Sequence, residues 1–156
     1  MLSKQLDEYF IQKALSVAKK GYLKGEIPVG ALAVNLDNEI ICTAHNECEC
    51  SNNPINHAEM ILLNKLSKNN IDKSNLTIYV TLEPCLMCAS AIMLSRIKRL
   101  VFGAYNKLIG GFGTTYDLSI EPNFQHNILI TGGILKNECN HLIDNFFKNI
   151  RRRDGT

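Results

Sequence analysis

The stretch Pro84-Cys85-Leu86-Met87-Cys88 places two cysteines three positions apart at the expected start of a helix. At this spacing both thiols can face one metal ion. Taken alone, such a pair is more typical of a structural zinc site or of a redox pair than of a catalytic centre. Its partners elsewhere in the chain therefore decide which chemistry applies.

His57-Ala58-Glu59 supplies an imidazole and a carboxylate, with residues 60–83 between this motif and the cysteine motif. One nitrogen and two sulfurs make three ligands, one fewer than the four that tetrahedral zinc prefers. A water in the fourth position would be activated by the metal. The two motifs together favour a catalytic zinc hydrolase with the ligands His57, Cys85 and Cys88.

Glu59 follows His57 by two residues, about 200° around an ideal helix, so it need not share a ligand position. A carboxylate beside the activated water can take its proton and return it to a substrate nitrogen, as hydrolytic deamination requires. The structural alternative is a glutamate placed in a first helical turn to suit the helix dipole. We predict that Glu59 is the catalytic acid-base residue.

The six cysteines are better explained as metal ligands or small core residues than as a disulfide framework. The first eight residues lack the sustained apolar core of a secretory signal, which indicates a cytoplasmic protein with reduced thiols. Cys42 and Cys139 are expected to pack in the core. Cys48 and Cys50 could form a four-cysteine zinc site with Cys85 and Cys88. Their C-x-C spacing, however, is tighter than the spacing of cysteines in most structural zinc sites.

A chain of 156 residues is typical of one domain that buries roughly 70% of its unfolded surface. Its apolar runs are far shorter than the 18 or so residues that span a bilayer, so no membrane partner is expected. The net charge of +2 neither requires nor excludes a nucleic-acid partner. Basic residues do cluster at the C-terminus.

Hydrophobic periodicity predicts four helices, over about 6–20, 57–68, 85–95 and 138–152. Five strands are predicted over about 29–34, 39–44, 76–81, 100–104 and 128–131. Asp37-Asn38 turns the first two strands into a hairpin. Gly21 and Gly25 are expected to end the first helix and Asn56 to cap the second. The glycine-rich stretch 110–113 lacks the setting of a nucleotide-binding fingerprint and is interpreted as a loop.

The histidine and cysteine motifs resemble the signature of the zinc-dependent nucleobase deaminases. Further blocks resemble the bacterial tRNA-specific adenosine deaminases of the cytidine and deoxycytidylate deaminase superfamily. These blocks are Glu26 to Ala31, Asn46, Thr81 to Ala89, Ser95 to Ile97 and Val101 to Ala104. The resemblance covers nearly the whole chain.

The resemblance implies a three-layer α/β/α cytidine-deaminase-like fold, with a five-stranded mixed sheet and helices on both faces. It implies one CMP/dCMP-type deaminase domain over residues 1–156, a homodimer and one zinc ion per subunit. The implied reaction converts the wobble adenosine of a tRNA anticodon stem-loop to inosine.

By position, Asn46 matches a base-contacting asparagine of the family and Val29 an apolar wall of its base pocket. From the residues alone, Asn46 is more typical of a turn. Ala58 and Pro84, inside the two motifs, are further expected substrate contacts.

At the C-terminus, Phe147, Arg151 and Arg152 combine aromatic and basic groups that suit a single-stranded anticodon loop. A solvated helix end is the alternative, because basic residues in a last turn also suit the helix dipole.

Asn106 departs from the family pattern, in which many relatives carry an acid at this position that is proposed to help hold the substrate backbone. Asparagine is neutral and would not repel a nearby phosphate. We therefore expect a weaker preference for RNA over DNA in this chain.

Two other functions fit the same residues. One is a guanine or cytidine deaminase that acts on a free base or nucleoside. The other is a zinc-stabilised RNA-binding module without catalysis.

Overall fold

The structure is a computed structural model that describes residues 2–155. Met1 and Thr156, the ends of the predicted domain, lie outside the described residues. The helices are α1 Leu2–Leu23, α2 Ala58–Lys68, α3 Leu86–Leu94 and α4 Lys136–Arg153, with short 3₁₀ helices at Leu118–Ile120 and Pro122–Phe124. The strands are β1 Gly30–Val34, β2 Ile40–His45, β3 Thr77–Leu82, β4 Arg99–Ala104 and β5 Leu129–Thr131.

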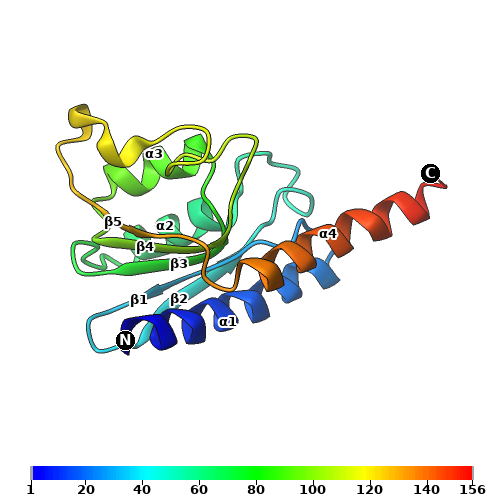
Figure 1. The fold of residues 1–156 in the computed structure, drawn as a ribbon, viewed down its shortest axis with the longest axis horizontal. Coiled ribbons are helices and arrows are strands. Elements are labelled where there is room, and N and C mark those ends of the chain that lie inside the picture. Colours follow the sequence, from blue (N-terminus) through cyan, green and yellow to red (C-terminus); the bar gives the residue numbers. More distant parts are fainter. Residues whose placement is uncertain (1, 156) are drawn as a thin grey trace.

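The five strands form one mixed sheet in the order β2-β1-β3-β4-β5. Strand β1 runs antiparallel to both β2 and β3, whereas β3, β4 and β5 are parallel to one another. Figure 1 shows α2 and α3 on one side of the sheet and α1 and α4 on the other. The predicted three-layer fold with a five-stranded mixed sheet is therefore confirmed.

Alternate residues of the central strands point into two separate cores. Ala31 and Ala33 of β1 face α2 and α3, while Leu32 and Val34 face α1. Burial on both faces explains the continuous apolar run of this strand. Gly30 allows α1 to approach closely, because a Cβ there would lie 2.1 Å from the carbonyl oxygen of Ala14. Among the described residues, no helix is long and apolar enough to cross a membrane.

The ends of two helices differ from the sequence prediction. Helix α1 continues through Gly21 and ends in a Schellman turn, in which the amide of Glu26 donates to the Gly21 carbonyl and that of Gly25 to the Tyr22 carbonyl. Gly25 has a φ of 82°, so this glycine ends the helix as predicted and Gly21 does not. Asn56 was the wrong choice of cap, because His57 occupies the N-cap position of α2.

A buried ionic network ties the start of α1 to the sheet. Asp7, only 2% exposed, accepts two hydrogen bonds from the Arg99 guanidinium, at 2.8 and 2.7 Å. The Tyr79 hydroxyl donates to the same carboxylate at 2.9 Å. Burial first, and then the charge of Asp7, raise the pKa of Tyr79, so the phenol stays a donor. The network connects α1, β3 and β4.

We expect Asp7→Asn to lower the free energy of unfolding by about 2–3 kcal/mol, because the Arg99 charge then loses its partner in a partly buried site. Denaturant titration would measure the loss. The exposed Asp37 provides the matched variant Asp37→Asn, which should change stability by less than about 0.5 kcal/mol. Equal stability of the two variants would contradict this role.

Candidate metal centre and base pocket

Helices α2 and α3 begin beside each other, and the three predicted ligands lie at or within one turn of their N-termini. His57 is the N-cap of α2 and Cys85 the N-cap of α3, both in extended backbone conformation. Neither side chain caps its own helix, and Cys88 lies one turn into α3. The ligands therefore sit where two positive helix-dipole ends meet, an environment that favours thiolates.

The three ligand atoms have the separations of a zinc site. The Nδ1 atom of His57 lies 3.5 Å from the sulfur of Cys85 and 3.5 Å from that of Cys88. Tetrahedral zinc, with bonds of about 2.3 Å to sulfur and 2.0–2.1 Å to nitrogen, would separate nitrogen and sulfur by about 3.6 Å. All three atoms lie within 4.8 Å of one another. This donor set fits zinc and leaves one coordination position for a non-protein ligand.

Hydrogen bonding distributes the protons of the donor set unevenly. The hydrogen bond from Cys88 lowers the pKa of Cys85, so Cys85 is the more readily ionised of the two thiols. The same bond, followed by burial, raises the pKa of Cys88. A bound zinc ion would make both sulfurs thiolates, because it deprotonates coordinating thiols.

Cys48 and Cys50 do not join the metal centre. Among the described residues, the group that could hold a metal consists of His57, Cys85 and Cys88. The Cys48 thiol instead donates to the side-chain oxygen of Asn46 at 3.2 Å. The four-cysteine alternative is therefore wrong. Cys139 is 1% exposed in the core on the α1 side of the sheet, and the partly buried Cys42 packs against the core on the α2 and α3 side, as predicted.

Glu59 lies in the first turn of α2, 4% exposed, next to the ligand set. Burial raises the pKa of Glu59 to about 7. A carboxyl group with this pKa can both accept and return a proton near neutral pH. The position and the pKa suit the acid-base role predicted for Glu59.

A pocket opens beside the metal centre. His57, Glu59 and Cys85 line it on the side of the metal centre. Four of the predicted substrate contacts line it, namely Val29, Asn46, Ala58 and Asn106. Ile27, Leu82, Glu83 and Ile109 also line it. Mostly apolar walls with a few polar groups are typical of a site for a flat heterocycle.

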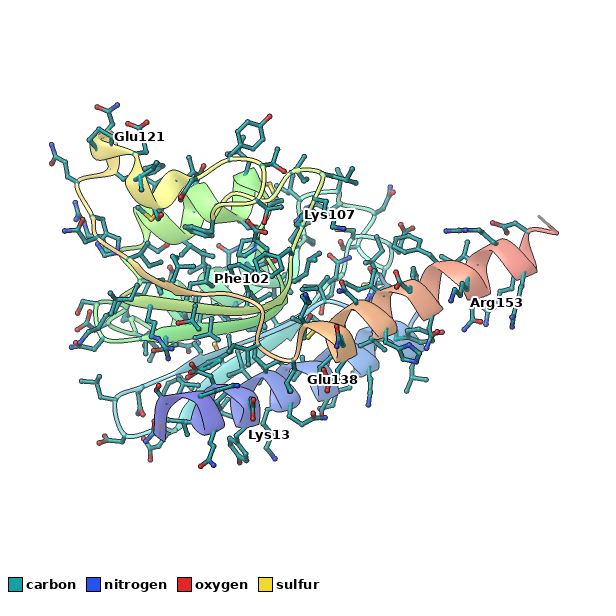
Figure 2. The ribbon with its side chains drawn as sticks, viewed as in Figure 1. Lys13, Phe102, Lys107, Glu121, Glu138 and Arg153 are labelled. Atoms are coloured by element: carbon teal, nitrogen blue, oxygen red, sulfur yellow. The ribbon has the colours of Figure 1, made fainter. Side chains whose placement is uncertain are left out.

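The other predicted contacts lie outside this pocket. Pro84 is buried, and its carbonyl accepts a hydrogen bond from the amide of Gly111 at 2.9 Å. Phe147, Arg151 and Arg152 lie on α4, which extends past the sheet (Figure 1). Figure 2 shows Arg153 near the far end of this extension. The predicted substrate contacts therefore lie in two places, the pocket beside the metal centre and helix α4 with its aromatic and positively charged side chains.

Two buried glutamates that sequence reasoning missed hold the loops around the pocket. Glu26 accepts hydrogen bonds from the amides of Glu49 and Cys50, in the loop between Asn46 and His57. Glu83 accepts hydrogen bonds from amides of the loop that carries Asn106. Acidic residues inside otherwise apolar segments were the available signal, because a buried carboxylate needs internal donors.

The fold and the metal centre define a zinc-dependent deaminase of the cytidine-deaminase-like class, and the comparisons agree. Residues 4–104 match the family model of the cytidine and deoxycytidylate deaminase zinc-binding region. The tRNA-specific adenosine deaminase of Bacillus subtilis (strain 168) is 40% identical over 149 residues, which cover 94% of this chain and 92% of that protein.

Two solved structures share the fold of this chain. One comes from a study of A-to-I editing by tRNA:A34 deaminases at the wobble position, with a TM-score of 0.79, 29% identity and coverage of 86% and 98% of the two chains. A guanine deaminase from Nitrosomonas europaea shares the fold, with a TM-score of 0.76, but only 18% identity over 89% of this chain and 83% of that one. The chain belongs to the tRNA-specific adenosine deaminase family of the cytidine and deoxycytidylate deaminases.

We expect His57→Ala, Cys85→Ala and Cys88→Ala each to lower bound zinc from one ion per subunit by more than tenfold, because each leaves only two protein ligands. Elemental analysis of purified protein would measure the metal. Cys48→Ser is the matched thiol control and should keep full zinc. Loss of zinc from the Cys48 variant would contradict a site made of three ligands.

Proposed function

We propose that this chain hydrolytically deaminates the wobble adenosine of a tRNA anticodon to inosine. The observation that carries the proposal is Glu59, a buried carboxyl group beside a three-ligand zinc set, on one side of a pocket that suits a nucleobase. The membership of the chain in the tRNA-specific adenosine deaminase family supports adenosine as the substrate.

The residues around the pocket would each serve one part of the reaction. Zinc, when held by His57, Cys85 and Cys88, supplies a water whose pKa is lowered towards about 7. Glu59 would take a proton from an attacking water as the water oxygen adds to C6 of the purine, and would deliver this proton to N1. Glu59 then transfers the second water proton to the amine at C6. The carbon–nitrogen bond breaks, ammonia leaves, and C6 keeps the oxygen of inosine.

The walls of the pocket would orient the base for this transfer. Val29 and Ala58 provide apolar contacts, and the Asn46 amide can hydrogen bond to the purine. The thiol of Cys48 donates to the Asn46 oxygen and so fixes the direction of the amide. Water is displaced from the apolar faces, which strengthens the polar contacts that remain.

The substrate would reach the pocket as part of an anticodon stem-loop, whose bases are unstacked and can be turned outward. Phe147, Arg151 and Arg152 on the projecting helix would contact the RNA by stacking and charge, while Pro84 supports the loop beside the pocket. A homodimer and a cytoplasmic location complete the proposal, in keeping with a family that modifies tRNA.

Wild-type protein is expected to form inosine in a stem-loop with adenosine at the wobble position, while Glu59→Ala keeps its zinc and loses at least about 10³-fold in rate. Inosine would be detected by nucleoside analysis after digestion. Free guanine and cytidine should release no ammonia, and release from either would favour the nucleoside deaminase. A zinc-loaded wild type that is as inert as Glu59→Ala would favour the RNA-binding module.

The neutral Asn106 is expected to weaken the preference for RNA over DNA relative to Asn106→Asp. The Asn106 side-chain oxygen accepts hydrogen bonds from the amides of Leu108 and Ile109, each at 3.2 Å. An aspartate can accept both bonds, so the substitution changes charge without breaking the turn. Deamination rates on matched RNA and DNA hairpins would give the ratio. Equal ratios for the two proteins would refute the expectation.

A further inference from the structure

The carboxylate of Glu83 is surrounded by hydrogen-bond donors from one loop. Its side chain is 1% exposed and follows directly after β3. One oxygen accepts from the amides of Phe112 and Thr114, at 3.1 and 3.2 Å. The other accepts from the Asn106 amide at 3.1 Å and from the Thr114 hydroxyl. Four donors on residues 106–114 thus converge on a single side chain.

The same loop is bound to the turn that carries the zinc ligand Cys85. The Leu86 amide donates to the Ile109 carbonyl at 2.9 Å, and Gly111 donates to the carbonyl of Pro84. Asn106 and Ile109 in turn line the base pocket. The position of the pocket wall is therefore defined relative to the metal centre through backbone hydrogen bonds and the Glu83 carboxylate.

The loop backbone wraps tightly around this carboxylate. A Cβ atom at Gly110 would lie 2.7 Å from the Glu83 carboxyl carbon and 2.5 Å from the Asn106 carbonyl oxygen. Residues 105–109 form no helix or strand, so their backbone lacks the ladder that fixes β3 and β4. A loop of this kind keeps one geometry only if its buried amides find other acceptors.

We propose that Glu83 is a positioning residue, which holds the Asn106–Ile109 wall at the distance from the metal centre that the substrate base requires. The proposal rests on the proposed function for the identity of the base. Both Glu83 oxygens are engaged by the loop, so its effect on the substrate is transmitted through Asn106 and Ile109. The acid-base step stays with Glu59.

Glu83→Gln tests this role at constant size. In glutamine, an NH2 group replaces one of the two carboxylate oxygens. This NH2 group then faces a backbone N–H of the loop, and both groups can only donate. Whichever way the side chain turns, at least one backbone N–H of residues 106–114 loses its acceptor. An unpaired buried amide is costly enough to shift a local equilibrium several-fold.

The binding experiment uses the Glu59→Ala background, so that the substrate is not consumed. Affinities are measured for two RNA stem-loops, one with adenosine at the wobble position and one with an abasic residue there. The dissociation constant for the abasic RNA, divided by that for the adenosine RNA, isolates the contribution of the pocket from that of the RNA backbone. We expect Glu83→Gln to reduce this ratio by about fivefold or more, with bound zinc unchanged.

Glu121→Gln is the matched control. Glu121 also accepts hydrogen bonds within a turn, from Asn123, and Figure 2 shows it at the end of the molecule opposite Arg153. This variant should leave the ratio unchanged. Gly110→Ala provides a second route, because it displaces the loop while Glu83 is intact, and it should lower the ratio as Glu83→Gln does.

Amide hydrogen exchange measures the loop independently of RNA. In Glu83→Gln, at least one of the amides of Asn106, Phe112 and Thr114 should exchange at least tenfold faster than in the parent, while those of β3 keep their protection. An unchanged binding ratio in both loop variants, or unchanged exchange in Glu83→Gln, would overturn the proposal. If the Glu59→Ala parent itself shows no preference for adenosine, the proposed function fails as well.

Discussion

The meeting of two helix N-termini is the constraint on which the rest of the site depends. His57 and Cys85 are far apart in the chain, and each is the last extended residue before a helix begins. Strands β2 and β3 both run antiparallel to β1, so they point the same way, and the segments that follow them, which carry His57 and Cys85, leave the same end of the sheet. The helix dipoles then stabilise the thiolates that a zinc ion needs.

The loops around this centre obtain their order from buried carboxylates. Glu26 fixes the segment between Asn46 and His57, and Glu83 fixes the segment that contains Asn106. Both glutamates stand beside rigid elements, the end of α1 and the end of β3. Irregular loops expose backbone amides that no strand partner satisfies, and an internal carboxylate accepts several of them at once. The pocket therefore has fixed walls without regular secondary structure.

The sequence predicted most of the regular structure and the whole metal centre, because both depend on local patterns. The nine predicted helices and strands all form, with ends shifted by a few residues, and α1 extends past Gly21 because the helix continues to the turn at Gly25. The Asn56 cap was wrong because the first position of α2 is given to a ligand. The short 3₁₀ helices at residues 118–124 were missed, since no periodicity marks them. The Glu83 contacts were missed because three of their four donors are backbone amides, which carry no residue-type signal such as the histidine and cysteines of the metal centre provide.

The separation of chemistry from substrate choice follows from this architecture. The ligands and Glu59 belong to the starts of two helices packed on the sheet. Three residues that would select the base, Val29, Asn46 and Asn106, lie outside the helices and strands, and those that would contact RNA lie on the projecting α4 (Figure 1). A guanine deaminase shares the same fold, so the fold alone does not choose the base. The geometry of the loop held by Glu83 is then as much a determinant of specificity as the side chains it presents, because a flat base is recognised by the spacing of the pocket walls.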